Sequence, residues 1–230
     1  MTYLFPILKV YHLGNGSLFK TLRYTTGMSR EKIGYFGGTF DPPHIGHLVL
    51  ASEAVYQFKL SCFYWGLTPD PPHKQSQAIT PLPHRLEMLK HMVAENPIFE
   101  ISHLEINRPG PHYTIDTIQL LSQQQPDADI VLLIGNDSLV DLPTWRRPLD
   151  LVTAVSKIGV MRRSSDSYDL PALEKQIPGL TDKVVFIDAQ IQPLSSREIR
   201  RRVKEGGVYR CYTLPSVADY IEENHLYRGT

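Results

Sequence analysis

The sequence predicts an α/β fold, in which a doubly wound parallel sheet forms a single domain. Apolar runs of strand length alternate with helical patterns along most of the chain. The run at Ile130–Ile134 is apolar throughout, as expected of a strand that is buried on both faces. Alternating strands and helices favour a parallel sheet wrapped by helices, and no internal repeat indicates another architecture.

The predicted strands are short apolar runs spread over most of the chain. They lie at Ile33–Phe36, Cys62–Leu67, Phe99–Leu104, Ile130–Ile134, Ile158–Met161 and Val184–Ile187. Between and after them, apolar side chains at helical spacing predict helices. The first predicted helix carries Leu48, Ala51, Val55 and Phe58 on one face. The others lie at Pro83–Glu95 (with Leu86, Leu89, Met92 and Val93 on one stripe), Tyr113–Gln123, Ser196–Lys204 and Ser216–Glu223.

The first 27 residues differ from the rest of the chain, because they mix Tyr, Gly and Thr without a clear period. We therefore expect residues 1–27 to be a dispensable extension, either disordered or produced by a start codon placed too early. Residues 28–230 are expected to form the folded domain. Met28 lies just ahead of the first predicted strand, so a chain that starts there keeps every predicted element.

Composition restricts the partners and the location. Lys and Arg total 24, as do Asp and Glu, so the formal net charge is zero and no nucleic-acid partner is expected. Cys62 and Cys211 form no CxxC pair, which favours free thiols in a reducing compartment. No apolar run approaches the ~20 residues of a membrane span, and no secretory signal is recognisable. We therefore expect a cytoplasmic protein without a membrane partner.

The segment from Gly37 to His47 has the residues best suited to chemistry. Its glycines let the backbone approach a ligand closely and adopt torsions that other residues avoid, and Thr39 and Asp41 can cap the helix that follows. His44 and His47 are three residues apart and share one face of a helical turn. Beside the positive end of that helix, two imidazoles can bind a phosphate and donate hydrogen bonds to a developing negative charge.

Other interpretations of this segment are less specific. The HxxH spacing could bind a metal, but the general-base Glu of the HExxH motif is absent. Neither the P-loop pattern GxxxxGK[ST] nor the dinucleotide pattern GxGxxG occurs here. The glycines alone could mark a simple tight turn, and the histidines could merely hold that turn together.

The string GGTFDPPHIGH at residues 37–47 resembles the HxGH motif of the nucleotidyltransferase superfamily. Members of this superfamily transfer a nucleotidyl group from a nucleoside triphosphate. The resemblance implies a Rossmann-like fold and implies that His47, the second histidine of the motif, contacts the phosphate under attack. By itself the motif does not separate adenylyl transfer from cytidylyl transfer.

Further segments narrow the resemblance to the nicotinate-nucleotide adenylyltransferases of bacterial type. They occur in the order of that family from about residue 32 to residue 228, and so cover nearly all of the chain beyond the first 30 residues. The segments are PPHK at 71–74, HYT at 112–114, IGNDSL at 134–139, LPTW at 142–145, LSSREIR at 194–200, and YIE at 220–222 with LYR at 226–228.

The resemblance implies that ATP and nicotinate mononucleotide react to give deamido-NAD and pyrophosphate, a late step in NAD biosynthesis. The mononucleotide phosphate attacks the α-phosphorus of ATP in line, so catalysis depends on positioning and charge stabilisation rather than on a protein nucleophile. Magnesium is expected to bind with ATP, and no dedicated protein metal site is expected. The rival hypotheses are the same chemistry on phosphopantetheine or nicotinamide mononucleotide, and a nucleotide-binding regulator that has lost catalysis.

The site residues implied by the resemblance form three groups. The expected catalytic residues are His44, His47, Lys74 and Arg200. The expected ATP-binding residues are Gly37, Gly38, Thr39, Phe40, His44, His47, Asp137, Ser195, Ser196 and Arg200. The residues expected to bind nicotinate mononucleotide are Thr114, Trp145 and Arg163.

Several of these residues also have a physical reason and an alternative role. Lys74 follows a proline-stiffened loop and can reach a triphosphate, or it is an ordinary solvated lysine. Asp137 follows a buried strand and can bind ribose hydroxyls, or it caps a helix. Trp145 can stack on a nicotinate ring, or it packs in the core. Thr114 opens a helix, where the resemblance places the nicotinate carboxylate, or it serves as the N-cap.

The arginines need separate treatment. Ser195 and Ser196 start a helix with hydroxyl groups, which suits an anion, and Arg200 resembles the family's triphosphate-binding arginine. Arg197 adds a charge where the family often has a small hydroxyl residue. The next two arginines, at 201 and 202, are expected to be solvated. Arg163 is placed at the mononucleotide phosphate, although its neighbour Arg162 fits the same role if the register slips by one.

Overall fold

The computed structural model describes residues 30–70, 79–94, 96–161, 169–189 and 194–228. Within them, six strands form one sheet in the order β3-β2-β1-β4-β5-β6, and every neighbouring pair is parallel. This order is that of a doubly wound Rossmann-like sheet, which confirms the predicted fold class. The strands are β1 (Glu31–Gly38), β2 (Cys62–Leu67), β3 (Phe99–Ser102), β4 (Ala128–Gly135), β5 (Lys157–Met161) and β6 (Val184–Ile187).

All six predicted strands form, but β1 and β4 extend beyond the predicted runs at both ends, and β5 begins one residue earlier than predicted. The third strand ends at Ser102 rather than Leu104, because the chain then turns and the N–H of Asn107 donates to the carbonyl of His103 over 2.9 Å. The predicted extension at residues 1–27 lies outside the described residues.

The predicted helices also form, and shorter ones appear between them. The predicted set is α1 (Ile45–Phe58), α2 (Leu82–Val93), α3 (Thr114–Gln124), α8 (Ser196–Lys204) and α9 (Pro215–Glu223). The helices that the sequence did not predict are α4 (Asn136–Asp141), η2 (Leu142–Thr144), α5 (Pro148–Ala154), α6 (Leu170–Gln176), α7 (Leu180–Lys183) and η3 (Arg210–Tyr212). None of these exceeds seven residues, so each is too short to show a clear helical period and depends on tertiary packing for its stability.

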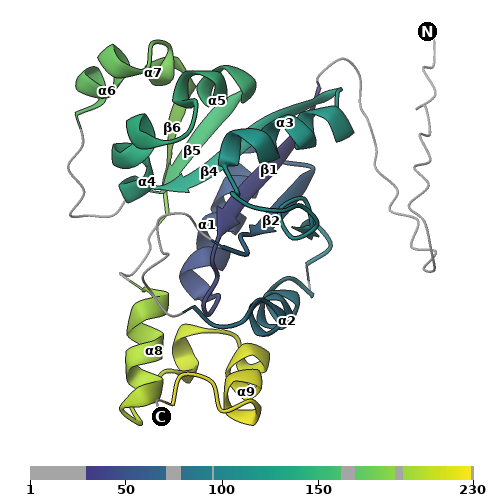
Figure 1. The fold of residues 1–230 in the computed structure, drawn as a ribbon, viewed down its shortest axis with the longest axis vertical. Helices are drawn as coiled ribbons and strands as arrows, with labels where there is room; N and C mark the ends of the chain where they lie inside the picture. The colour runs from purple at the N-terminus through teal and green to yellow at the C-terminus, as the bar shows by residue number, and fades with distance from the viewer. Residues whose placement is uncertain (1–29, 71–78, 95, 162–168, 190–193, 229–230) are drawn as a thin grey trace, which may run out of the picture.

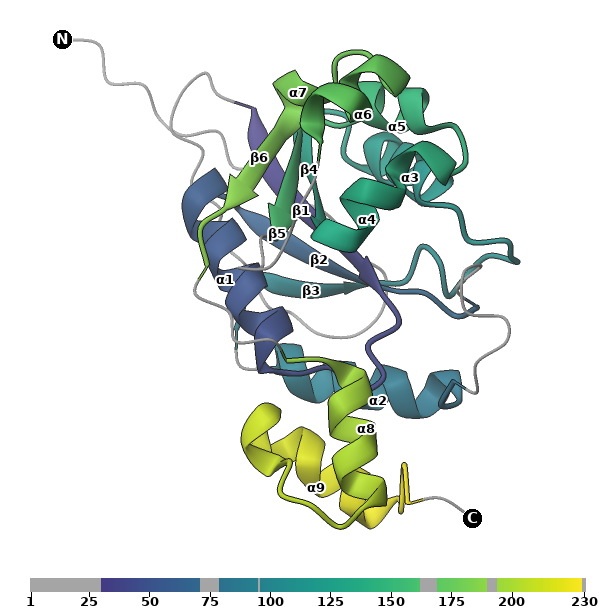
Figure 2. The ribbon, with the colours of Figure 1, turned by 90° about the vertical axis from the view of Figure 1, so that its left-hand side faces the viewer.

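The sheet separates two hydrophobic clusters. Along β4, residues 130, 132 and 134 belong to one cluster, and residues 131 and 133 belong to the other. Helices α3, α5 and α6 complete the first cluster, while α1, α2 and α9 complete the second. Figures 1 and 2 show α3, α4 and α5 on one side of the sheet and α1 on the other. Strand β4 is therefore buried on both faces, as its apolar sequence predicts.

The buried face of α1 differs in part from the predicted one. Ala51 and Phe58 are buried as predicted, whereas Leu48 and Val55 lie half-buried at the rim of the cluster. The helix turns small side chains toward the sheet, so the buried stripe runs through Leu50, Ala51, Ala54 and Phe58. In α2 the predicted apolar stripe does face the core, and this helix packs against α9.

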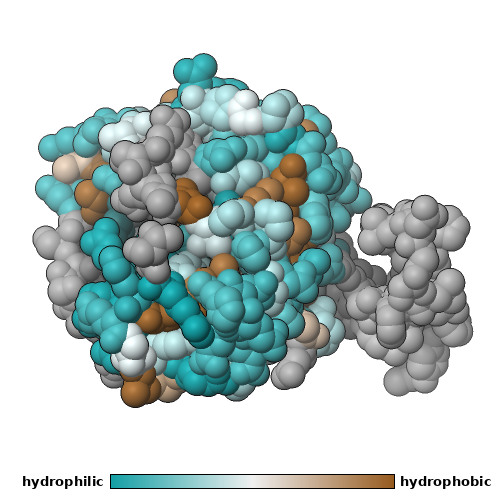
Figure 3. All heavy atoms as spheres, turned by 60° about the horizontal axis from the view of Figure 1, so that its bottom comes forward, coloured by the Kyte–Doolittle hydropathy of each residue, from teal (hydrophilic) through white to brown (hydrophobic). Residues whose placement is uncertain are grey.

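Helices α8 and α9 lie at the bottom of Figure 1, below the sheet. Figure 3 shows that the described residues at this end are mainly hydrophilic, with hydrophobic residues in small separate groups. Among the described helices, none has both the length and the apolar character that crossing a membrane requires. Cys62 is buried, Cys211 is exposed, and both are free thiols, as the sequence analysis expects.

Candidate active site

The predicted site lies where the two halves of the sheet meet. Strands β1 and β4 are neighbours although β2 and β3 separate them in the sequence, so the strand order reverses between them. In such sheets, ligands bind beyond the carboxyl ends of the strands at this switch point. Strand β1 leads through residues 39–44, here named the β1–α1 turn, into α1, and β4 leads directly into α4.

The two histidines at the end of the β1–α1 turn lie against each other. Their rings stack with centroids 3.6 Å apart and an interplanar angle of 20°. The backbone N–H of His44 donates to Nδ1 of His47 over 3.1 Å. Because Nδ1 accepts this bond, the proton of a neutral His47 ring sits on Nε2, where it can be donated to a ligand. His44 is buried and His47 half-buried, so His47 is the more accessible of the two.

The glycines around this turn make room for aromatic rings. A Cβ atom on Gly38 would lie 2.9 Å from the ring of Phe40, and a Cβ on Gly46 would lie 3.1 Å from the ring of His44. The left-handed backbone occurs at Phe40, with φ of 46°, and not at Gly37 or Gly38. The prediction of special glycine torsions is therefore wrong here, because both glycines stay extended and paired with β2.

Asp41 has a different role from the predicted one. Helix α1 begins after His44, so the prediction that Thr39 and Asp41 cap it is wrong. The Asp41 side chain is buried, with 5% of its residue surface exposed. Its Oδ1 accepts a hydrogen bond from the hydroxyl of Tyr227 over 2.6 Å, and its Oδ2 accepts one from the N–H of Thr80 over 3.2 Å. Asp41 thus joins the β1–α1 turn to the segments around residues 80 and 227.

The backbone carbonyls of the β1–α1 turn accept hydrogen bonds from distant side chains. The donors are Arg200 Nη1 to the carbonyl of residue 41 (2.6 Å), Ser196 Oγ to that of residue 42 (2.8 Å) and Thr213 Oγ1 to that of residue 43 (2.9 Å). Two of the predicted ATP-binding residues, Ser196 and Arg200, therefore contact the turn directly. Thr213, at the end of η3, was missed by the sequence analysis.

Arg85 is the other important residue that the sequence analysis missed. It lies in α2, where only 2% of its surface is exposed. Its guanidinium donates to the carbonyls of Thr80 (2.7 Å), Thr39 (3.1 Å), Thr68 (2.8 Å) and Pro69 (2.7 Å). Burial lowers the pKa of Arg85, and the negative charge of Asp41 acts in the opposite direction. The planar guanidinium of Arg85 thus joins the start of the β1–α1 turn, at Thr39, to the segments around residues 68–69 and 80.

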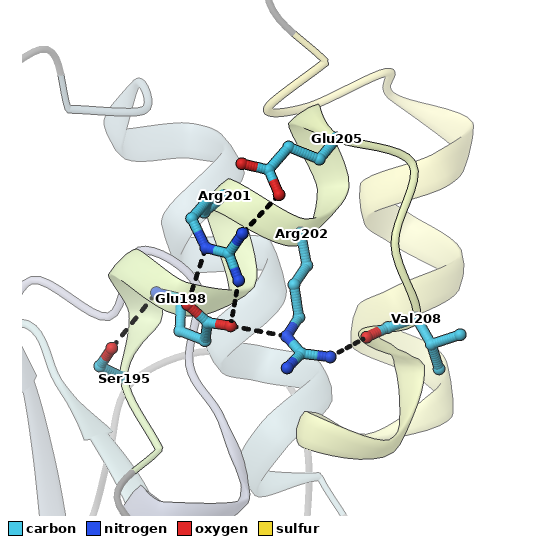
Figure 4. Close-up of polar contacts among 6 residues, drawn as sticks. All are labelled: Ser195, Glu198, Arg201, Arg202, Glu205 and Val208. Atoms are coloured by element: carbon cyan, nitrogen blue, oxygen red, sulfur yellow. Dashed lines mark hydrogen bonds and ion pairs between the residues drawn. The ribbon is translucent and has the colours of Figure 1, made fainter.

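At the start of α8, the side chains of Ser195 and Glu198 make their hydrogen bonds to residues of the same helix (Figure 4). Ser195 caps the helix by accepting a hydrogen bond from the N–H of Glu198 over 3.2 Å. The carboxylate of Glu198 accepts bonds from Arg201 and Arg202, each at 2.7 Å, and these bonds lower its pKa to about 2. Arg201 is exposed as predicted, but the guanidinium of Arg202 lies 4.8 Å from the ring centroid of Tyr212. The prediction that Arg202 is solvated is therefore wrong.

Two of the residues predicted to bind the mononucleotide, Thr114 and Trp145, lie in described segments. These segments meet at the start of α3. Thr114 is the first residue of α3, and Tyr113 is its N-cap, so the alternative role of Thr114 as N-cap is excluded. Trp145 follows η2, is half-buried and contacts the hydrophobic cluster beneath α3 and α5. The guanidinium carbon of Arg146 lies 6.0 Å from the ring centroid of Tyr113, which brings the Trp145 segment beside α3.

Two polar residues follow the carboxyl end of β4. Asp137 is exposed in the first turn of α4, whose N-cap is Gly135, so Asp137 is not the cap. The preceding residue, Asn136, is 7% exposed, and its Oδ1 atom has no hydrogen-bond partner among the described residues. A buried acceptor without a partner is costly, which suits a position where a ligand supplies the donor.

A buried polar network supports the start of α3. Glu105, which is 3% exposed, accepts hydrogen bonds from Tyr35 Oη over 2.9 Å and from Thr117 Oγ1 over 3.0 Å. Burial raises the pKa of Tyr35 well above its ordinary value. The network continues through Arg108, which donates to Thr117 Oγ1 (2.8 Å) and to the carbonyls of Pro111 (3.2 Å) and Tyr113 (3.3 Å).

Two predicted site residues, Lys74 and Arg163, lie outside the described residues, as does Arg162. Within the described ranges, no group of three or more His, Cys, Asp or Glu side chains is arranged to hold a metal ion. The structure therefore brings the histidines, Arg200, Ser196 and the end of β4 to one edge of the sheet. It also brings the segment that contains Trp145 beside the start of α3, where Thr114 lies.

The fold and the histidine turn together define a nucleotidyltransferase of the HxGH type, and the comparison with family models agrees. The cytidylyltransferase-like family model matches residues 35–202. That range begins in β1, ends in α8 and contains both histidines.

Similar sequences narrow the family. A probable nicotinate-nucleotide adenylyltransferase of Thermomicrobium roseum is 40% identical over 198 residues, which cover 86% of this chain and 92% of that relative. The nicotinate-nucleotide adenylyltransferase of Bacillus subtilis is 38% identical over 199 residues, which cover 86% of this chain and 100% of that relative. The chain therefore belongs to the nicotinate-nucleotide adenylyltransferase family, whose members are nucleotidyltransferases of NAD biosynthesis.

Solved structures agree on the fold. The nicotinic acid mononucleotide adenylyltransferase of Plasmodium falciparum complexed with NaAD has a TM-score of 0.71 at 19% identity, covering 86% of this chain and 97% of that one. A nicotinate-nucleotide adenylyltransferase structure from Vibrio parahaemolyticus, assigned by similarity, has a TM-score of 0.62 at 17% identity, covering 87% and 97%. At such low identity these likenesses confirm the fold alone.

Proposed function

We propose that this chain catalyses the reaction of ATP with nicotinate mononucleotide to give deamido-NAD and pyrophosphate. The observation that supports this most is the stacked pair of His44 and His47 at the carboxyl end of β1, in a chain of this family. The pair stands at the N-terminus of α1, where the helix dipole favours phosphate.

In this proposal, His47 stabilises the charge that develops as the bond to the α-phosphorus forms. Its Nδ1 is occupied by the N–H of His44, so Nε2–H is the group that donates to a phosphate oxygen. The ring of His44 lies behind that of His47, at 3.6 Å between centroids, and limits its rotation. A donor that is oriented before the reaction needs no reorganisation in the transition state, which is the source of its catalytic effect.

Arg200 and the start of α8 are proposed to serve the triphosphate. One guanidinium nitrogen of Arg200 donates to the carbonyl of Asp41, and its remaining N–H groups are available to phosphate oxygens beside the histidines. Ser195 acts chiefly as the cap of α8 and Ser196 as a donor to the β1–α1 turn. We propose that they support the ATP site through these contacts, together with the backbone of Gly37, Gly38, Thr39 and Phe40.

The nucleosides are proposed to lie on either side of the switch point. Asp137 and the buried Oδ1 of Asn136 can accept hydrogen bonds from ribose hydroxyl groups of ATP. On the other side, Thr114 and the indole of Trp145 would hold the nicotinate carboxylate and ring. Lys74 is proposed to reach the triphosphate and Arg163 the mononucleotide phosphate.

Magnesium is proposed to enter with ATP as part of the substrate. The groups proposed to contact phosphate, the imidazoles of His44 and His47 and the guanidinium of Arg200, are poor partners for Mg²⁺. The carboxylate of Asp41 in the β1–α1 turn already accepts hydrogen bonds through both of its oxygens. Mg²⁺ usually keeps several waters and binds through substrate phosphates, so we expect ATP to supply most of its ligands.

The test is to measure pyrophosphate release from Mg–ATP with each acceptor separately. Nicotinate mononucleotide should support the fastest release, and mass spectrometry should detect deamido-NAD. Nicotinamide mononucleotide and phosphopantetheine serve as the alternative acceptors. Faster release with either of them would contradict the proposed acceptor, and no release with any acceptor would support the regulator hypothesis.

We also propose that residues 28–230 suffice for this activity. A chain that starts at Met28 should keep the melting temperature and turnover of the full chain, because it keeps all six strands of the described sheet. Circular dichroism melting and the pyrophosphate assay measure both. Loss of folding on this truncation would show that residues 1–27 are structural.

A further inference from the structure

Tyr227 has an unusual backbone conformation for a bulky residue. Its φ is 62°, in the left-handed region that glycine normally occupies. A residue stays in such a conformation only when its surroundings hold it there, and such residues cluster at functional sites. The contacts of its side chain therefore indicate why this backbone conformation is kept.

The side chain of Tyr227 reaches the β1–α1 turn. Its hydroxyl donates to Oδ1 of Asp41 over 2.6 Å, and it lies 3.9 Å from the sulfur of Met88 in α2. Burial raises the pKa of Tyr227 far above its ordinary value, and the charge of Asp41 acts in the same direction. The phenol therefore remains a hydrogen-bond donor at neutral pH.

Asp41 is held at both its side chain and its backbone. Tyr227 and the N–H of Thr80 donate to its two carboxylate oxygens, while Arg200 donates to its carbonyl oxygen over 2.6 Å. Asp41 is three residues before His44, so its position sets where the turn enters α1.

We propose that Tyr227 is a positioning residue for the adenylyl transfer: its hydroxyl fixes Asp41 and thereby orients His44 and His47 toward the phosphates. The inference rests on the proposed function, since it assigns the histidines to phosphate. Removing the hydroxyl leaves a buried carboxylate oxygen without its donor, and the turn then shifts to regain one. A shift of the reacting groups by about 1 Å can cost roughly a hundredfold in rate.

The test compares two Tyr→Phe variants. Tyr227→Phe should lower kcat by about tenfold or more, with a much smaller change in KM for ATP. Tyr220→Phe is the matched control, because its hydroxyl lies in α9 and pairs with Nδ1 of His84 at 3.0 Å. The control should keep the kcat of the unmodified chain. Equal kcat values for the two variants, or a loss that only follows the unfolded fraction, would overturn the proposal.

A double-mutant cycle adds a second readout. Tyr227→Phe removes the donor and Asp41→Ala removes the acceptor of one bond, so their effects on kcat should be non-additive. Additive effects would show that Tyr227 acts elsewhere and would overturn the proposal.

Histidine NMR separates this inference from the proposed function. In ¹⁵N spectra of the imidazole rings, Tyr227→Phe should shift the signals of His44 and His47, whereas Tyr220→Phe should shift that of His84. This pattern tests the positioning role even if no acceptor supports turnover. Unchanged His44 and His47 signals in Tyr227→Phe would overturn the inference whatever the activity.

Discussion

The two sides of the proposed site, one for ATP and one for the acceptor nucleotide, are held in place in different ways. On the ATP side, the β1–α1 turn is fixed by donors far along the chain, with separations of 159 residues for Arg200 to Asp41 and 186 for Tyr227 to Asp41. On the acceptor side, the start of α3 is fixed mainly by near neighbours, such as Arg108 to Thr117, nine residues apart. The ATP side therefore depends on the completed fold, whereas the acceptor side is largely a local structure. Changes of acceptor preference can then arise within residues 105–117 and at Trp145 without disturbing the binding of ATP.

The largest expected effect concerns the histidine pair on the ATP side. His47→Ala should keep the fold and much of the ATP affinity but lose at least about a hundredfold in turnover, since one preorganised donor is typically worth 10²–10³ in kcat. His44→Ala should also be impaired, with more of the loss in nucleotide binding. Single-turnover kinetics beside thermal melting measure both.

His91→Ala is the control for these variants, because His91 lies in α2 and its ring packs 5.8 Å from that of Tyr220. It should turn over normally. A His47→Ala enzyme with near-normal turnover would show that the histidines only hold the turn together.

The second prediction compares two arginines directly, the buried Arg85 and the half-buried Arg108. Arg85→Met should lower the free energy of unfolding by ~3 kcal/mol or more, because each buried carbonyl left without a donor costs about 1–3 kcal/mol. Urea unfolding gives this value. In the kinetics, Arg85→Met should impair the use of ATP, whereas Arg108→Met should chiefly raise KM for the mononucleotide. If the two variants change the same kinetic constants, the proposed division of the site is wrong.

The third prediction concerns the acceptor ring. Trp145→Ala should weaken the use of nicotinate mononucleotide about tenfold or more, since stacking on an aromatic side chain is worth ~1–3 kcal/mol. Binding of ATP should change far less, and Trp145→Phe should keep part of the effect of stacking. Calorimetric titration with each nucleotide measures both affinities. An equal loss of ATP affinity, or a collapse of stability, would show that Trp145 is a core residue, which its half-buried contact with the cluster allows.

The smallest expected effect is on the surface of α8. The pKa of Glu198 is lowered to about 2 by its bonds to Arg201 and Arg202, below the ordinary value of 4.5. The folded state therefore favours the ionised carboxylate. The stabilisation is present above pH 4.5 and is lost as the pH falls toward 2. Urea unfolding should show a small stability difference between the unmodified chain and Glu198→Gln at pH 6 that shrinks at pH 3. A difference independent of pH would contradict this account.

The parts of the fold that could be predicted are those with a local sequence signal. The strands are continuous apolar runs, and the β1–α1 turn combines glycine, proline and histidine within 11 residues, from Gly37 to His47. The alternating pattern of the chain predicts a parallel sheet, but it does not predict that β1 lies beside β4. These signals also predicted that His44 and His47 share one face, and in the structure their rings lie against each other.

The contacts that could not be predicted are mainly hydrogen bonds to backbone carbonyls, which every residue has. Arg85 and Thr213 donate to backbone carbonyls, and a carbonyl acceptor leaves no mark in the sequence. In α2, Arg85 is one of several charged residues in an amphipathic pattern, and the pattern does not indicate that it is the buried one. Tyr227 lies in a segment that resembles the family. Its partner Asp41, however, is predicted from the sequence to cap a helix, so the sequence does not indicate a contact between them. The partners of Thr213 and Tyr227 also lie far away in the chain, so no local sequence pattern indicates these contacts.

The hydrogen bond from Tyr227 to Asp41 also determines when the site can first exist during synthesis. At ~5–20 residues per second, the ribosome needs roughly 10–40 s to add the 186 residues that separate the two partners. During that interval the histidine motif has already emerged, while its last hydrogen-bond donor has not been made. The nascent chain therefore carries the phosphate-binding residues without the contacts that orient them. We therefore expect full activity only after the segment around Tyr227 has folded back onto α2.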